Sequence, residues 1–277
     1  MWLRIEKLKH RRDAVRQRIY DFLAPHETHA LFILGNLNAD FPGSHLYVMR
    51  RGREWLGLAG YYEGPRSLIP FSRDPDITRK LVRHIARRHR DIGWMNGIGY
   101  SAGPAYETLL DMGYVPVWDP KQVFMELDSE PPPQPHEERV RLMRESDRVQ
   151  VARFMRYVRR HPDPEGELGD EEIRGIGLNR LRYVLDVGGQ AVSTACTNGI
   201  GIKAFQVIGV ATAPEHRRRG YARAVCAALI RAMYERSATK CVIFTNHDNL
   251  AAIRCYEGLG FRVTDDYIVA RFKSRGR

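Results

Sequence analysis

A proline-rich stretch near the middle of the chain is the strongest constraint on its fold. Four of the five positions from 131 to 135 are proline. Each proline fixes φ and removes a backbone hydrogen-bond donor, so neither a helix nor a central strand can continue through this stretch. We therefore expect a stiff, extended linker at residues 131–138. It divides the chain into segments 1–130 and 139–277, each of ordinary domain size.

Composition excludes several classes of protein. Hydrophobic residues make up 43% of the 277 and charged residues 28%, which suits a folded core under a polar surface. No apolar run reaches the roughly 18–20 residues of a membrane helix, and the N-terminus lacks the charged-then-apolar order of a secretory signal. The four cysteines form no CxxC pair, and the ten histidines form no HExxH motif. We therefore expect a cytoplasmic protein that binds neither membrane nor metal.

The charge balance is basic. The chain has 44 Lys and Arg against 33 Asp and Glu, a formal net charge of +11. Most of the excess lies in residues 131–277, which hold 25 Lys and Arg against 17 Asp and Glu. Such an excess fits a solvated basic surface, an anionic cofactor, an acidic substrate or nucleic acid, and charge alone does not choose among them.

Both segments predict a mixture of helices and strands. The first predicts helices at 12–23 and 77–88 and strands at 46–49, 55–59 and 122–127. The second predicts helices at 147–157, 221–236 and 250–257 and strands at 183–187, 191–197, 205–212, 242–245 and 267–272. A helix–Gly–aromatic corner recurs at Leu109–Tyr114 and Tyr256–Phe261. The shared order of elements favours a duplication, with coincidence between two glycine helix stops as the alternative.

The stretch from Val207 to Arg223 predicts a loop that binds a diphosphate. A predicted strand ends at Pro214, and a predicted helix begins near Gly220. The first amides of a helix lack internal partners and carry partial positive charge, so a diphosphate can bind where small residues leave the approach open. Three consecutive arginines add positive charge. The motif is neither a Walker loop nor a dinucleotide fingerprint, and a basic loop before an amphipathic helix is the alternative.

A second pattern follows about thirty residues later. Asn249 and Tyr256 are seven residues apart, which is two helical turns, so they share one face of the predicted helix. Ala252 lies between them and leaves room for a ligand. The alternative for Tyr256 is an aromatic residue of the core.

Together the two stretches resemble the GCN5-related N-acetyltransferase (GNAT) superfamily. The match covers roughly residues 139–272, with signature regions at Val210–Arg223 and Asn246–Phe261. The resemblance implies an α/β fold: a mixed, mostly antiparallel sheet flanked by helices and splayed between two central strands, with acetyl-CoA in the splay. The whole chain is similar to two-domain bacterial members, with 1–130 as a degenerate GNAT-like domain and 139–277 as the acetyltransferase domain.

The resemblance also implies the roles of individual residues. Acetyl-CoA would be the co-substrate, and Tyr256 the general acid beside the CoA thiolate. Backbone groups at 210–212 would pair with pantetheine, and amides at 218–223 would hold the pyrophosphate. The implied cofactor-binding residues are Val210, Ala211, Thr212, Arg217, Arg218, Arg219, Gly220, Tyr221, Ala222, Arg223, Asn249 and Ala252.

The chain departs from the family pattern in two places. The first half has no G-x-[G/A] at a helix start, and Leu109 stands at the position of Tyr256, so only the second half is expected to bind acetyl-CoA. The strand before the loop lacks the carboxylate that many members place there. A base would have to come from Glu215, His161 or a water chain, which weakly favours an acceptor amine of low pKa.

The expected function is therefore acetyl-CoA-dependent N-acetylation of an amine by direct attack in a ternary complex. Two alternatives stay open: a non-catalytic acetyl-CoA-binding module with a structural Tyr256, and an RNA-directed acyltransferase, suggested by the net charge. Residues 161–167 are predicted to form a loop. If this loop has a function, it would be a lid on the acceptor side. The sequence predicts neither the acceptor nor the oligomeric state.

Overall fold

The two halves of the chain fold with the same order of elements. The computed structural model describes residues 2–118, 121–159, 161–177 and 180–273. The first half contains β1 (Leu3–Lys7), α1 (Asp13–Leu23), α2 (Leu31–Asn38), β2 (Ser44–Arg51), β3 (Glu54–Tyr62), β4 (Ser67–Phe71), α3 (Pro75–Arg88), β5 (Trp94–Ile98), α4 (Gly99–Asp111) and β6 (Lys121–Leu127). The second contains β7 (Val140–Leu142), α5 (Arg148–Val158), α6 (Asp170–Arg174), β8 (Arg182–Val187), β9 (Gln190–Ile200), β10 (Ala204–Thr212), α7 (Tyr221–Tyr234), β11 (Lys240–Asn246), α8 (Leu250–Glu257) and β12 (Arg262–Arg271). This repeat matches the predicted duplication.

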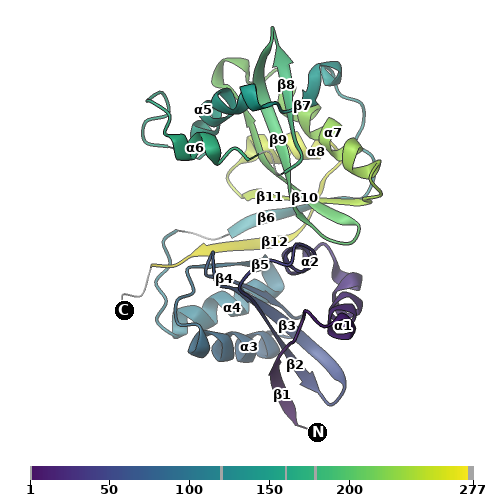
Figure 1. Cartoon of the computed structure of the whole chain (residues 1–277), viewed down its shortest axis with the longest axis vertical. Coiled ribbons are helices and arrows are strands. Elements are labelled where there is room, and N and C mark those ends of the chain that lie inside the picture. Colours follow the sequence, from purple (N-terminus) through teal and green to yellow (C-terminus); the bar gives the residue numbers. More distant parts are fainter. Residues whose placement is uncertain (1, 119–120, 160, 178–179, 274–277) are drawn as a thin grey trace.

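All twelve strands join in one sheet, in the order β1-β2-β3-β4-β5-β12-β6-β11-β10-β9-β8-β7. The last strand of each half is exchanged: β12 pairs with β5 of the first half, and β6 pairs with β11 of the second (Figure 1). The two exchanged strands also pair with each other, antiparallel, at the centre of the sheet. The order is therefore the same read from either edge, as expected for two copies related by a two-fold axis. The predicted domain boundaries remain a prediction.

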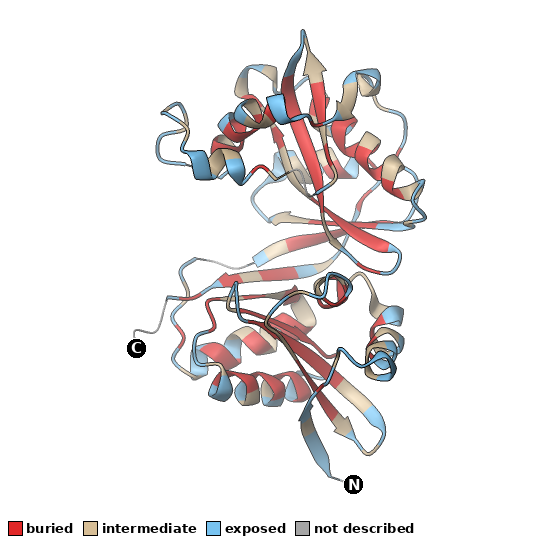
Figure 2. Cartoon of the chain, in the orientation of Figure 1, coloured by how far each residue is buried: buried red, intermediate tan, exposed pale blue. Residues whose placement is uncertain are grey.

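The helices are divided between the two faces of the sheet. Along β2, Tyr47 packs in the cluster of α3 and α4, while Val48 packs in that of α1 and α2. In the second half, Tyr183 of β8 packs towards α7 and Val184 towards α5. Since alternate residues of a strand point to opposite faces, α7 and α5 cover opposite faces too. Figure 2 shows the burial that results, in the central strands and on the sides of the helices that face them.

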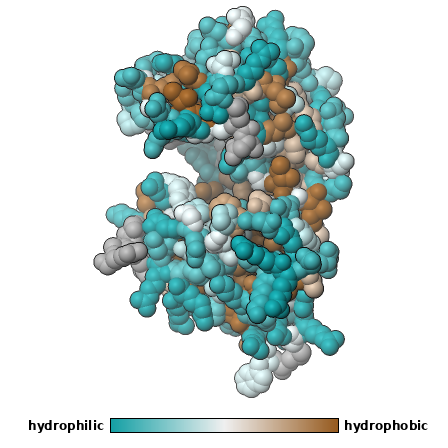
Figure 3. All heavy atoms as spheres, viewed as in Figure 1, coloured by the Kyte–Doolittle hydropathy of each residue, from teal (hydrophilic) through white to brown (hydrophobic). Residues whose placement is uncertain are grey.

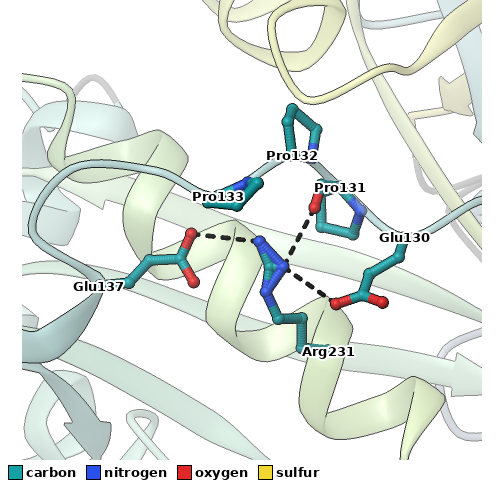
Figure 4. Close-up of a pocket in the computed structure, with 6 residues that line it drawn as sticks. All are labelled: Glu130, Pro131, Pro132, Pro133, Glu137 and Arg231. Carbon is teal, nitrogen blue, oxygen red and sulfur yellow. Dashed lines mark hydrogen bonds and ion pairs between the residues drawn. The ribbon is translucent and has the colours of Figure 1, made fainter.

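The proline-rich segment lies along α7, outside helix and strand up to residue 136. The Arg231 guanidinium on α7 donates to Glu130 Oε1 at 3.2 Å, to the Pro131 carbonyl at 3.0 Å and to Glu137 Oε1 at 3.3 Å (Figure 4). These groups line a surface pocket at the C-terminal end of α7, away from Gly220. Through these three hydrogen bonds, Arg231 fastens the linker to the second half.

A carboxylate of the first half holds a turn of the second. Glu27 Oε1 accepts hydrogen bonds from the amides of Ile202, Lys203 and Ala204 at 2.5, 2.6 and 2.7 Å. Asn38 Nδ2 donates to the carbonyl of Gly201 in the same turn at 2.8 Å. The β9–β10 turn is thus tied to the segment between α1 and α2 and to the end of α2, and it fixes one half of the molecule against the other.

Glu27→Ala is expected to lower the free energy of unfolding by about 2 kcal/mol, because three amides lose a charged acceptor. Chemical denaturation measures the change. Glu107→Ala is the matched control, since Glu107 forms an exposed ion pair with Arg79 on the surface, where such pairs contribute about 0–1 kcal/mol. Equal losses in the two variants would contradict the role given to Glu27.

Candidate active site

The parallel strands β10 and β11 separate halfway along their length. They pair only at Ala204, Phe205 and Gln206 of β10, although β10 continues to Thr212 and β11 to Asn246. Beyond Gln206 the backbone of β10 has no strand partner on the β11 side. The sequence resemblance implied a splay between two central strands, and the structure has one here.

A β-bulge bends β10 just past this separation. Between Ile208 and Ala211, two residues of β10 lie opposite one residue of β9. Gly209 in the bulge has φ of +60°, a conformation that glycine adopts without steric cost. Val210 follows it and is partly exposed although it lies within the sheet. The predicted pantetheine partners 210–212 therefore lie on the separated arm of β10.

The start of α7 carries free backbone donors. Gly220 precedes the helix with φ of +82°, and as a glycine it has no side chain that could cap the first amides. The first helical amide with an acceptor is that of Ala224, so the amides of 220–223 have none within the described chain. A Cβ atom at Gly220 would meet nothing within 4 Å. Arg218 also has a positive φ, and such left-handed residues turn consecutive amides into an anion-binding concavity.

Four exposed arginines surround this helix start: Arg217, Arg218, Arg219 and Arg223. Arg217 Nε donates to the Thr212 carbonyl at 3.2 Å, and Arg219 Nη2 to the Glu215 carbonyl at 3.3 Å. Among the residues that the structure describes, no carboxylate lies within ion-pair distance of any of the four. Their charge is therefore available to an anion at the free amides.

The predicted residues of α8 lie close by. Asn249 precedes the helix, where its Oδ1 accepts from the Ala252 amide at 3.3 Å and its Nδ2 donates to Thr245 Oγ1 at 3.0 Å. It thus caps α8, seven residues before Tyr256, and its contact with the cofactor remains a prediction. Val210 and Ala252 both pack on the buried cluster that contains Tyr256, so the separated strand and the two helices meet there.

Tyr256 is 7% exposed. Burial raises the pKa of its hydroxyl well above the ordinary value near 10. No described group forms a hydrogen bond with this hydroxyl. A neutral phenol with a free proton can act as a general acid.

The equivalent region of the first half is closed. Strands β4 and β5 also pair only at one end, at Ser67 and Leu68 of β4. The first amide past β4, that of Ser72, donates to Ser101 Oγ of α4 at 3.2 Å, and Ser101 is fully buried. A Cβ atom at Gly97 of β5 would lie 3.4 Å from Ala102 of the same helix. The start of α4 therefore fills the space between these strands.

The start of α3 is closed as well. Asp74 caps this helix, and its Oδ1 accepts from the amides of Asp76 at 2.8 Å and Ile77 at 3.2 Å. A carboxylate of the chain thus occupies the amides that correspond to those of 220–223. These contacts give a physical basis to the prediction that only the second half binds acetyl-CoA.

The two side chains considered as bases from the sequence are both exposed. Glu215 is exposed in the short 3-10 helix at Pro214–His216, and His161 is exposed beyond α5, with Nδ1 2.7 Å from the Asp163 carbonyl. Gln206 is the buried polar residue on the face of β10 opposite α7, and its Oε1 accepts from Asn198 Nδ2 at 2.9 Å. Among the described residues, no group of three His, Cys, Asp or Glu could hold a metal ion. None of the described helices is long and apolar enough to span a membrane.

The predicted loop at 161–167 has no helix or strand and is fastened to α5. The buried Arg156 donates to the carbonyls of Asp163, Gly166 and Glu167 and forms a two-pronged ion pair with Glu172 of α6. This loop and α6 lie on the face where Figure 3 shows the surface hollowed between the two halves. Arg156 therefore sets the position of one wall of that hollow.

The Arg156–Glu172 pair is expected to weaken in acid. Hydrogen bonds from Arg156 and from the Gly169 amide lower the pKa of Glu172 from 4.5 to about 2. A lowered carboxyl pKa stabilises the folded state above the unfolded value and loses that effect as the pH falls through the folded value. Hydrogen exchange at 161–169 should therefore accelerate between pH 4.5 and 2 beyond its intrinsic pH dependence, and at neutral pH in Glu172→Gln. Equal exchange in Glu172→Gln and Glu171→Gln, an exposed neighbour, would contradict this.

Comparisons with known proteins agree with this geometry. Residues 148–261 match the model of the acetyltransferase (GNAT) family. No curated protein matches the chain. Among solved structures, a tandem GNAT protein from the clavulanic acid biosynthesis pathway is 17% identical, with a TM-score of 0.59 over 100% of this chain and 99% of its own. A GCN5-related N-acetyltransferase from Sphaerobacter thermophilus is 14% identical, with a TM-score of 0.56 over 99% and 97%.

A Drosophila protein reaches a TM-score of 0.67 at 14% identity, over 96% of this chain and 98% of its own. At such identities the likeness concerns the fold, whereas the family match concerns the sequence of the second half. Residues 148–261 therefore belong to the GNAT acetyltransferase family, and the whole chain shares the fold of a tandem GNAT protein.

Proposed function

We propose that the chain is an acetyl-CoA-dependent N-acetyltransferase in which only the second half binds the co-substrate. The observation that carries the proposal is the start of α7, where the amides of 220–223 have no acceptor and four arginines have no carboxylate partner. A pyrophosphate supplies the negative charge that such a helix start favours. The separated arm of β10 lies at the end of the strand that leads into this loop.

The residues present suit each part of acetyl-CoA. The amides of 218–223 and the arginines would hold the pyrophosphate. The backbone at Val210, Ala211 and Thr212 would pair with the amides of pantetheine on the side where β10 lacks a strand partner. Ala252 and the cap Asn249 would border the same arm from α8.

The chemical step is a direct transfer. The acceptor nitrogen attacks the thioester carbonyl, the new C–N bond replaces the C–S bond, and a backbone amide of the bulged strand stabilises the negative oxygen between these events. The Tyr256 phenol donates its proton to the departing thiolate. The ammonium proton of the acceptor leaves to solvent or to a base.

The absence of a carboxylate on β10 bears on the acceptor. A Lys-type ammonium, with a pKa near 10.4, needs about 4–5 kcal/mol to lose its proton at pH 7, whereas an α-amine near 7.7–8.0 needs about 1. On the face of β10 opposite α7, Gln206 can accept a hydrogen bond but cannot take up the proton. This supports an acceptor amine whose pKa is low in the complex.

Calorimetry with CoA and acetyl-CoA, and acetyl-CoA consumption with a panel of amines, test the proposal. We expect binding of one molecule per chain and turnover with a subset of the panel. Absence of heat with both ligands would overturn the proposal, and binding without turnover of any amine would favour the non-catalytic module.

A further inference from the structure

Arg182 of β8 carries a buried guanidinium that has no anionic partner in the part of the chain that the structure describes. Its residue is 8% exposed. Among the described residues, its side chain donates from Nη1 to Thr194 Oγ1, at 3.3 Å, and its buried Nε has no hydrogen-bond partner. Within the described parts of the chain, no carboxylate lies within ion-pair distance of it.

Arg156, the other buried arginine among the described residues of this half, donates to Glu172 and to three carbonyls. The partly buried Arg141 donates to both Asp147 and Asp186. Leaving a buried charge unpaired costs several kcal/mol. Arg182 is therefore the exception, and a ligand that brings an anion would supply what the chain does not.

The surroundings of Arg182 are positive. Burial, and after it the charges of Arg180 and Arg159, lower the pKa of its guanidinium. The neighbouring Cys196 thiol gives no counter-charge, because burial raises its pKa. Among the described residues, Arg182 of β8, Arg180 just before it and Arg159 at the end of α5 thus gather without a negative group.

The guanidinium lies at the point where β10 leaves β11. A Cβ atom at Gly209 would be 3.6 and 3.9 Å from the two terminal nitrogens of Arg182, and 3.4 Å from Cys196 Sγ. Gly209 directly precedes Val210, the first predicted partner of pantetheine. Cys196 pairs with Arg182 on one side and with Ile208 on the other, so these side chains share one face of the sheet. Val184, which pairs with Thr194 on the same face, packs in the cluster of α5. Helix α5 therefore covers this face.

We propose that Arg182, with Arg159 and Arg180, binds a carboxylate of the acceptor, so that the substrate is an amine that also carries a carboxylate, as an amino acid does. This inference rests on the proposed function and names its substrate class. The planar fork of a guanidinium matches both oxygens of a carboxylate, which makes such a pair strong and directional.

The same cluster compensates for the missing base. Positive charges near an ammonium group lower its pKa, so an amine whose carboxylate lies on Arg182 loses its proton more readily than in water. They also repel acceptors that bring only positive charge, such as polyamines. One arrangement thus selects the substrate and prepares it for attack.

The test compares the twenty proteinogenic amino acids with their amides, which lack the carboxylate charge. Binding to the CoA-saturated protein is measured by calorimetry, and turnover by acetyl-CoA consumption. We expect at least one amino acid to bind and its amide to bind about 30-fold more weakly. Arg182→Met should remove this preference without changing the affinity for CoA, and Arg182→Lys, which keeps the charge without the fork, should retain part of it.

Arg153→Met is the matched control, because Arg153 is exposed on α5 and forms no ion pair with the described residues. Arg182→Met should melt at or above the temperature of the wild type, since it removes an unpaired buried charge. The inference is overturned if no amino acid binds at about 20 mM, or if Arg182→Met keeps the preference. Loss of CoA binding by the wild type would instead overturn the proposed function, so the two failures are distinct.

Discussion

Gly220→Asp is expected to weaken the binding of CoA at least about 100-fold, a loss of about 2.7 kcal/mol, while the protein still folds. The new carboxylate would accept from the amides at the start of α7 and repel the pyrophosphate. The chain already contains this arrangement in its first half, where Asp74 occupies the amides at the start of α3. Asp tolerates a positive φ better than most residues, and a Cβ atom at Gly220 meets no neighbour, so the fold should survive.

Gly188→Asp is the control for this variant. Gly188 has φ of +61° in the β8–β9 turn, and a Cβ atom there also meets nothing within 4 Å. The control therefore carries the same backbone strain and the same added charge without touching the helix start. Calorimetry gives the affinity of each variant, and thermal melting gives its stability. If Gly220→Asp binds CoA with an affinity within about three-fold of the control, the pyrophosphate does not bind at the start of α7.

The elements that carry the site could be predicted because their signals are local. The spacing of apolar residues placed α7 and α8 to within two residues of their observed ends. Pro214 and Gly220 marked the loop between β10 and α7, and both act through backbone geometry that depends on few neighbours. The free amides follow from this geometry, so the sequence alone could point to an anion.

Other parts of the fold depend on contacts between distant segments. The exchange of β6 and β12 follows from pairing between the halves, and no local pattern encodes a partner more than a hundred residues away. Helix α2 was missed because its apolar residues follow no single stripe: it lies between the halves, with Leu31, Ile33, Leu34 and Leu37 all buried. Strand β5 was missed because Asn96 and Gly97 interrupt its apolar run.

Arg182 could not be recognised from the sequence either. It stands at the start of an apolar strand, where an arginine is ordinarily an exposed edge residue. Only the packing of β8 against β9, and the bulge of β10 beyond it, show that the guanidinium is buried and unpaired.

Tyr256→Phe is expected to lower kcat by about 100-fold or more and to leave the affinity for CoA within about two-fold of the wild type. The reason is that the phenol supplies a proton only as the thiolate leaves, so its loss affects the transition state and not the bound ground state. Burial keeps the pKa of this hydroxyl above its ordinary value, so the wild-type rate should not fall through its ionisation below about pH 10.

Tyr234→Phe is the matched control. Tyr234 is also a helical tyrosine, and it lies at the end of α7 opposite Gly220. Its hydroxyl donates to the Leu127 carbonyl at 3.2 Å. Removing that hydroxyl should cost about 1 kcal/mol of stability and leave kcat unchanged. The two variants together separate chemistry from packing: if kcat falls equally in both, or in neither, Tyr256 is a core residue, and the proton for the thiolate must come from solvent.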